Sequence, residues 1–143
     1  MSSFAAGLIA AFGLVNAVAI LGSAGLLATA LDVSNDASLT MAGGAASTTQ
    51  LLYVASGQLW GVGGLFFGLW LIPMGWLVLQ SGWLPRLLGW LLVVGGLGYA
   101  LSAFVTYLIP DAGTAASLMT LPATVGEFWI LGYLIIRGVR RPA

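Results

Sequence analysis

The residue in this sequence best suited to chemistry is Glu127, an acidic side chain within a long apolar stretch. An ionisable group inside a membrane-spanning segment marks a functional site by default, because its desolvation is costly. Such a carboxyl group could carry protons or hold a polar substrate. Gln58 and Tyr107 are expected at a similar depth, while Asn16 in the first apolar stretch is expected to hydrogen-bond between helices. These four residues form the candidate intramembrane polar site.

A structural role for Glu127 competes with this one. Thr124 and Glu127 have the spacing of a capping box, in which the glutamate returns to cap the start of its own helix. Glu127 would then begin a helix near the membrane interface and take no part in transport. We prefer a structural role for Glu127, either this cap or a hydrogen bond within the bundle, and leave the functional role open.

Other kinds of chemistry are poorly supported by the composition. The 143 residues include no cysteine and no histidine, which excludes disulfides, thiol chemistry, and haem or zinc sites that need imidazole. Serine and threonine are present, but no histidine or lysine is available to activate them as nucleophiles. Four basic and four acidic residues give net charge +0, so no basic surface indicates nucleic-acid binding. We therefore expect no enzyme activity, no cofactor and no metal.

The hydrophobic content predicts a membrane protein. Hydrophobic residues make up 60% of the chain and charged residues 6%, whereas soluble domains carry roughly 25% charged residues. Uncharged runs of at least about 20 residues can each cross a bilayer as a helix. The expected spans are residues 4–31, 51–80, 87–109 and 121–139. The sequence thus predicts an all-α integral membrane four-helix bundle, a single transmembrane domain over residues 1–143, whose first span is retained rather than cleaved as a signal.

The arginines indicate how this bundle is oriented. With four spans and a cytoplasmic N-terminus, all basic residues fall on the cytoplasmic side, as the positive-inside rule requires. They are expected to contact lipid headgroups, and they are Arg86, Arg137, Arg140 and Arg141. Asp32, Asp36 and Asp111 fall on the opposite side. We therefore expect both termini in the cytoplasm and a multi-pass protein of the bacterial cytoplasmic membrane.

Small residues on the second span predict close helix packing. In lipid, helices associate largely through small residues that let their backbones approach. Gly57 and Gly61 form one small-xxx-small motif, and Gly64 and Gly68 form a second. Gly75 continues a seven-residue repeat from Gly61 and Gly68. Gly98 on the third span completes the predicted helix-packing set. Pro73 lies within the second span and predicts a bend or a hinge near the carbonyl of Leu69.

Two phrases resemble a known family. They are Phe67 to Val78 (FGLWLIPMGWLV) and Ser81 to Gly89 (SGWLPRLLG), followed by Gly98-Tyr99, Gly126-Glu127 and Ile136 to Arg140. Over about the C-terminal two thirds of the chain, they resemble the bacterial multi-spanning family called domain of unknown function 4386. The resemblance implies a helical membrane protein and supplies no activity or catalytic residue.

Two roles are consistent with these observations. The first is an accessory or scaffold subunit that packs against other membrane helices, in a homo-oligomer or a larger membrane complex. The second is a small transporter or proton-linked component that uses Glu127. The first role depends on the glycines, and the second depends on the carboxyl group.

Overall fold

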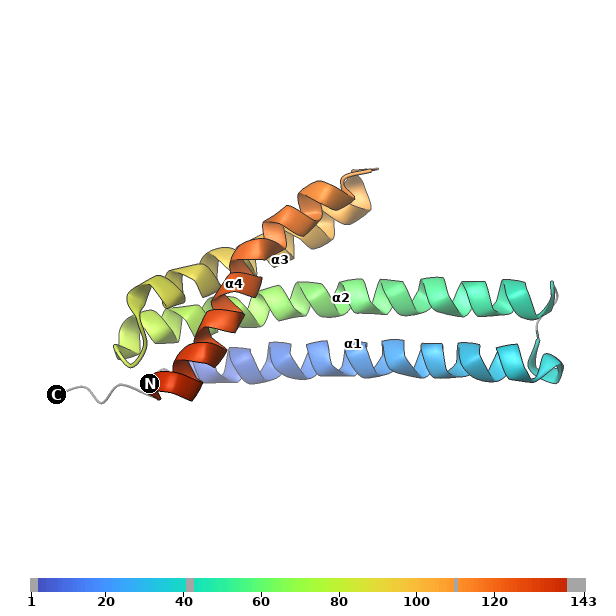
Figure 1. The fold of residues 1–143 in the computed structure, drawn as a ribbon, viewed down its shortest axis with the longest axis horizontal. Coiled ribbons are helices and arrows are strands. Elements are labelled where there is room, and N and C mark those ends of the chain that lie inside the picture. The colour runs from blue at the N-terminus through green and yellow to red at the C-terminus, as the bar shows by residue number, and fades with distance from the viewer. Residues whose placement is uncertain (1–2, 41–42, 110, 139–143) are drawn as a thin grey trace. The chain divides into compact units, whose positions relative to one another are not determined.

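Four long helices make up the computed structural model, which describes residues 3–40, 43–109 and 111–138. They are α1 (Ser3–Asn35), α2 (Gly44–Ser81), α3 (Arg86–Leu108) and α4 (Gly113–Arg137), with the short 3-10 turn η1 (Ala37–Leu39) after α1 (Figure 1). These described residues form no strand. Each long helix has the length and apolar composition needed to cross a membrane. The predicted all-α membrane fold with four spans is confirmed.

Helix α2 begins earlier than its expected span, at Gly44 instead of residue 51. Hydroxyl groups in its first turns explain the difference. Ser47 Oγ donates a hydrogen bond to the carbonyl oxygen of Gly43, and Thr48 Oγ1 donates one to that of Gly44, each at 3.1 Å. Such bonds to the carbonyl four residues back let serine and threonine remain within a helix.

Helix α4 also begins earlier than its expected span, at Gly113 instead of residue 121. The same kind of bond supports its first turns. Ser117 Oγ donates to the carbonyl oxygen of Gly113, and Thr120 Oγ1 donates to that of Ser117, each at 2.8 Å. The hydroxyl groups of these polar residues are thus satisfied by the helix itself.

Residues with a left-handed backbone conformation follow the ends of α2, α3 and α4. Gly82 has a φ of +67° between α2 and α3, and Gly138 has a φ of +64° after α4. Asp111, between α3 and α4, has a φ of +62°, a conformation that aspartate tolerates better than most side chains. Pro110, which precedes Asp111, lies outside the described residues.

The chain forms two compact units. The hairpin unit, residues 15–63, contains the second part of α1 and the first part of α2, which run antiparallel on either side of η1 (Figure 1). The core unit, residues 1–14 and 64–143, contains the start of α1, the second part of α2, and all of α3 and α4.

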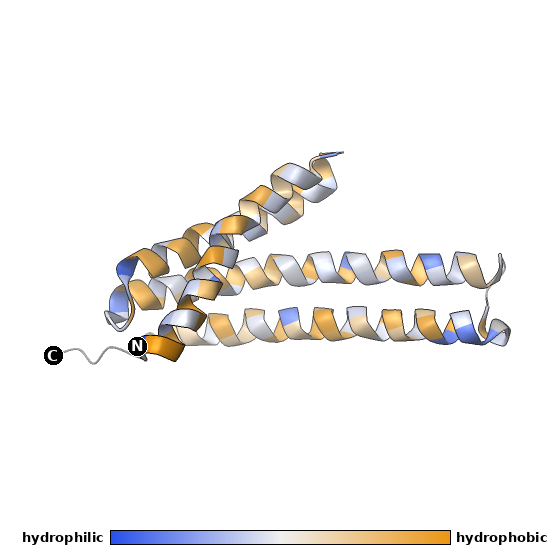
Figure 2. Ribbon diagram, in the orientation of Figure 1, coloured by the Kyte–Doolittle hydropathy of each residue, from blue (hydrophilic) through white to orange (hydrophobic). Residues whose placement is uncertain are grey.

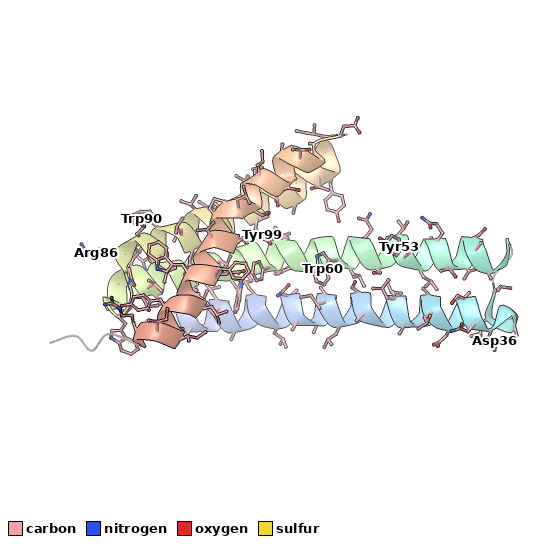
Figure 3. All side chains as sticks on the ribbon, in the orientation of Figure 1. Asp36, Tyr53, Trp60, Arg86, Trp90 and Tyr99 are labelled. Atoms are coloured by element: carbon pink, nitrogen blue, oxygen red, sulfur yellow. The ribbon has the colours of Figure 1, made fainter. Side chains whose placement is uncertain are left out.

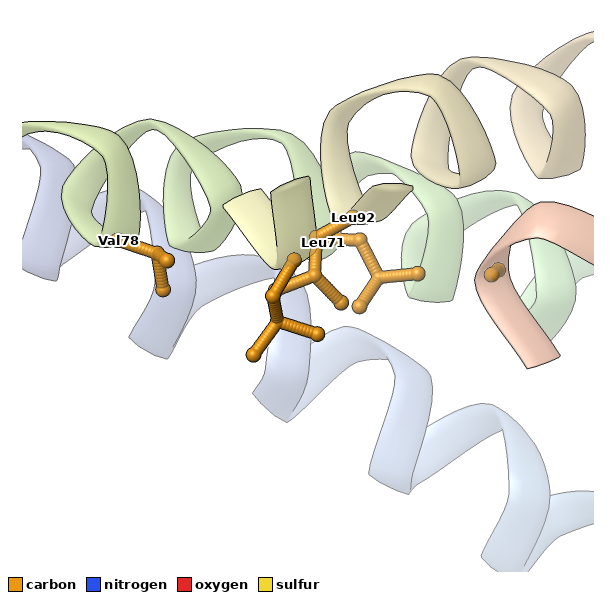
Figure 4. Packing of buried hydrophobic residues seen from close by; sticks show 5 residues of the cluster. Leu71, Val78 and Leu92 are labelled. Carbon is orange, nitrogen blue, oxygen red and sulfur yellow. The ribbon is translucent and has the colours of Figure 1, made fainter. Parts of the chain in front are cut away.

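A small apolar cluster holds the core unit together. Its buried members come from three helices and are Leu71, Val78, Leu88, Leu92 and Ala123 (Figure 4). Leu71, Leu88 and Leu92 are the largest side chains that are fully buried. Partly buried aromatic residues, including Phe67, Trp70, Tyr99 and Trp129, pack around them. The cluster joins α2, α3 and α4.

Many large apolar side chains face outward. Phe128 is 72% exposed and Ile136 is 80% exposed, and apolar residues run along all four helices, with hydrophilic ones at the α1–α2 and α2–α3 connections (Figure 2). A monomer in water rarely exposes such large contiguous apolar patches. Lipid is the solvent that can cover them, which agrees with the expected contact with membrane lipids.

Candidate functional site

Two predicted glycines bring the backbones of α2 and α3 into direct contact. A Cβ atom added at Gly68 would lie 2.6 Å from the carbonyl oxygen of Gly96, and one added at Gly75 would lie 2.7 Å from that of Gly89. These separations are well inside van der Waals contact, so no side chain fits without moving a helix. Gly68 and Gly75 therefore pack within the chain and are unavailable to a separate partner.

The same arrangement uses two glycines on α3 that were absent from the predicted set. Gly89 and Gly96 are seven residues apart, and so are Gly68 and Gly75. Because α2 and α3 are antiparallel, Gly68 meets Gly96 and Gly75 meets Gly89. Matching seven-residue glycine repeats in consecutive spans are the sequence signal that could have identified this pairing.

Helix α4 crosses α3 at two further glycines. A Cβ atom at Gly98 would overlap the carbonyl group of Met119, and one at Gly95 would overlap the backbone of Ala123. Gly126 on α4 faces Leu92 across the same interface, where an added Cβ atom would lie 3.4 Å from the leucine side chain. The predicted Gly98 thus lies at the α3–α4 crossing.

The remaining predicted glycines lie in more open surroundings. An added Cβ atom at Gly57, on the hairpin unit, would meet nothing within 4 Å. At Gly64, in the core unit, it would approach the Tyr99 ring at 4.0 Å. Gly61 is half-buried in the hairpin unit. The predicted glycine face therefore divides into a part that packs within the chain and a part that remains open at Gly57.

Polar residues join the two helices of the hairpin unit. The buried hydroxyl groups of Ser23 and Ser56 form a hydrogen bond at 3.1 Å. Asn16 packs against Gly63, where an added Cβ atom would lie 3.2 Å from the amide oxygen. The proposed role of Asn16 between helices is consistent with this position.

Beside the serine pair lies a groove of about 420 Å³, which we call the hairpin groove. Its lining includes Ser23, Tyr53, Ser56, Gly57, Gln58 and Trp60. Tyr53 and Trp60 are 64% and 61% exposed (Figure 3), and they lie on one face of α2 with Gly57 between them. The exposed Gln58 amide is next to this notch.

Glu127 lies well inside α4, which overturns the capping-box interpretation. The helix begins at Gly113, and the Thr124 hydroxyl donates to the carbonyl oxygen of Thr120 at 3.3 Å instead of capping a helix start. Glu127 is half-buried, and its carboxyl group lies close enough to the Tyr99 hydroxyl for electrostatic interaction.

Aromatic rings line the core unit near Tyr99. The Phe67 ring lies 5.0 Å from the Tyr99 ring and 5.8 Å from the Trp70 ring, measured between centroids. The Trp70 indole N–H is buried and has no acceptor among the described residues. The core unit therefore carries a donor without a partner as well as the carboxyl group of Glu127.

The other predicted polar residues are distributed separately. Tyr107 lies near the end of α3 and is 54% exposed. Because Gly98 pairs with Met119 and α3 is antiparallel to α4, Tyr107 lies near the start of α4 and away from Glu127. Gln58 and Asn16 belong to the hairpin unit, whereas Glu127 and Tyr107 belong to the core unit.

The two arginines within the described ranges lie at helix ends. Arg86 is the first residue of α3 (Figure 3) and Arg137 is the last of α4; Arg140 and Arg141 lie outside the described residues. Asp36 follows α1, where a hydrogen bond from the Ser38 side chain and one from its backbone N–H lower the pKa of the carboxyl group below 3.8. Over the described ranges, no group of His, Cys, Asp or Glu could hold a metal ion.

The chain belongs to the family described as a domain of unknown function (DUF4386), whose profile matches residues 1–138. The match extends beyond the C-terminal two thirds that carried the resemblance and includes the first helix. No curated protein and no solved structure matches the chain. The chain is thus a membrane protein in a family of unassigned activity.

Proposed function

We propose that this protein is a non-catalytic accessory or scaffold subunit, which binds a transmembrane helix of another protein or of a second copy through the hairpin groove. The observation that carries the proposal is Gly57. It is a small-residue notch that nothing in the described chain fills, next to an exposed amide. In the core unit, by contrast, Gly68, Gly75 and Gly98 pack against the chain's own backbone.

The polar residues of the groove support a helix as the occupant. Gln58 is seven residues inside the expected span that starts at residue 51, which places it about 10 Å deep at 1.5 Å per residue. An amide that faces hydrocarbon lacks the hydrogen bonds it would form in water, and this costs free energy. A partner helix that presents a polar side chain would satisfy Gln58, while Gly57 would let the two backbones approach.

The proposed location is the bacterial cytoplasmic membrane, with both termini inside. Arg86 at the α2–α3 turn and Arg137 at the end of α4 support this orientation, since basic residues remain on the cytoplasmic side. The α1–α2 connection, which contains η1, and the α3–α4 turn would then face the exterior, where Asp36 and Asp111 lie.

The test is the substitution Gly57→Leu, which fills the notch and whose Cβ atom would meet nothing within 4 Å. Its matched control is Gly132→Leu on α4, another glycine with nothing within 4 Å of an added Cβ atom. The complex is extracted from native membranes in mild detergent, and its size is measured by native electrophoresis. We expect Gly57→Leu to release a free chain that is still folded and Gly132→Leu to keep the complex. An intact complex with Gly57→Leu would contradict the proposal.

A second candidate function is proton-linked transport, and the position of Glu127 favours it. The side chain lies within a helix, away from any cap, and interacts with Tyr99. If Glu127 carries protons, Glu127→Gln abolishes proton flux in proteoliposomes and leaves the complex intact. Unchanged flux, or no flux with the native chain, would eliminate this candidate.

A further inference from the structure

An apolar cavity of about 400 Å³ lies in the core unit, between the end of α2, the α2–α3 turn and α4. Its wall on α2 runs from Met74 to Ser81, Trp83 closes it at the turn, and Ile130 lines it from α4. Nothing in the roles proposed above uses this space. We call it the turn cavity.

The helices on both sides of the turn cavity, α2 and α4, change from apolar to polar in the same direction. On α2, Met74 and Ser81 are seven residues apart and lie on one face, which spans about 10 Å. On α4, Ile130 and Arg137 have the same spacing, so Arg137 lies two turns beyond the cavity wall on the same face. The cavity thus has an apolar interior and a polar end.

Two arginines lie at the same end of the core unit as Ser81. Because α3 runs antiparallel to both α2 and α4, its first residue, Arg86, lies at the same end of the core unit as Ser81 and Arg137. Figure 3 shows Arg86 at the start of α3, and in the sequence it closely follows Trp83 and Leu84, which line the cavity.

The acidic residues of the core unit lie away from these arginines. Asp111 is at the far end of α3, about 35 Å from Arg86 by helical rise. Glu127 precedes Arg137 by ten residues, or about 15 Å along α4. An anion supplied from outside the chain is therefore the complement to the two arginines.

We propose that the turn cavity binds one acyl chain of an anionic phospholipid, whose phosphate contacts Arg86 and Arg137. An acyl chain matches an apolar space whose α2 wall extends about 10 Å from Ser81 to Met74. A basic pocket at the cytoplasmic interface selects lipids by headgroup charge. Trp83, 45% exposed at the turn, lies where tryptophan contacts headgroups.

The experiment measures lipid retention by native mass spectrometry of the full chain in detergent, with dioleoyl phosphatidylglycerol or dioleoyl phosphatidylcholine added. The two lipids share acyl chains and differ in net charge. We expect the native chain to retain one phosphatidylglycerol preferentially. Each of Arg86→Gln and Arg137→Gln should lower that affinity by about fivefold, as expected for one basic residue at a membrane surface.

A cavity-filling variant tests the acyl chain separately. Ile130→Trp should reduce retention of phosphatidylglycerol at least tenfold, whereas Ile135→Trp, at a position that is 77% exposed, should leave it unchanged. Leu77→Phe fills the same cavity from α2 and replaces Ile130→Trp if that variant does not fold. Equal retention of the two lipids by the native chain, or full retention by a folded cavity-filling variant, would overturn the proposal.

Discussion

The close contact between α2 and α3 in the core unit predicts a large difference between two glycine-to-alanine changes on α2. In Gly68→Ala, the new Cβ atom would lie 2.6 Å from the carbonyl oxygen of Gly96 and 2.8 Å from the backbone nitrogen of Ala100. Ordinary contacts are about 3.5–4.0 Å, so α2 and α3 must separate by about 1 Å. In Gly57→Ala the new atom meets nothing within 4 Å.

The free-energy difference follows from these contacts. Both changes gain the same helix propensity, because each replaces glycine by alanine within α2. That term cancels when the two variants are compared. The remaining difference in unfolding free energy comes from overpacking at Gly68, because forcing a methyl group into a packed interface costs about 1–3 kcal/mol. Gly68→Ala should therefore be less stable than Gly57→Ala by about 1–3 kcal/mol.

The assay is reversible unfolding in mixed micelles, with increasing dodecyl sulfate and tryptophan fluorescence as the readout. Gly132→Ala on α4, a third open glycine, is a second control and should behave like Gly57→Ala. If Gly68→Ala unfolds at the same dodecyl sulfate fraction as Gly57→Ala, the close approach of α2 and α3 is wrong, and so is the division between packed and open glycines.

Two further predictions concern the hairpin unit. Ser23→Ala or Ser56→Ala should each destabilise the hairpin by about 0.6 kcal/mol, the average for a hydrogen bond between membrane helices; additive effects in the double variant would show that the two hydroxyl groups do not interact. Asp36 has a lowered pKa, so its stabilising contribution is present above pH 3.8 and is lost as the pH falls through its folded pKa. Ser38→Ala removes the largest cause, and carboxyl chemical shifts should show the Asp36 pKa moving up toward 3.8; an unchanged titration would contradict this origin.

Composition and charge placement were sufficient to predict the class of fold. Uncharged apolar runs of membrane-spanning length become helices because hydrocarbon offers backbone groups no other hydrogen-bond partner. The helix starts at Gly44 and Gly113 were missed, because serine and threonine look like loop residues until their hydroxyl groups find a carbonyl within the helix. Hydropathy identifies the segments that contact lipid, but it does not identify the residue at which a helix begins or ends.

The candidate site was harder to predict, because local patterns have more than one structural meaning. The spacing of Thr124 and Glu127 fits a helix start, but it also occurs within a helix, and only the position of Gly113 distinguishes the two. The glycine repeat on α2 predicted a packing face without its occupant. Gly68 and Gly57 differ because one faces α3 and the other faces open space, which is a property of the fold.

The most direct test of the four membrane crossings is the side of the membrane on which each connection between helices lies. The chain has no native cysteine, so a single introduced thiol can be labelled without background. In intact cells, a membrane-impermeant maleimide should label Ser38→Cys before α2 and Thr114→Cys at the start of α4. Gln80→Cys at the end of α2 should react only after the membrane is permeabilised. Labelling of Gln80→Cys in intact cells as fast as Ser38→Cys would contradict four membrane crossings with both termini inside.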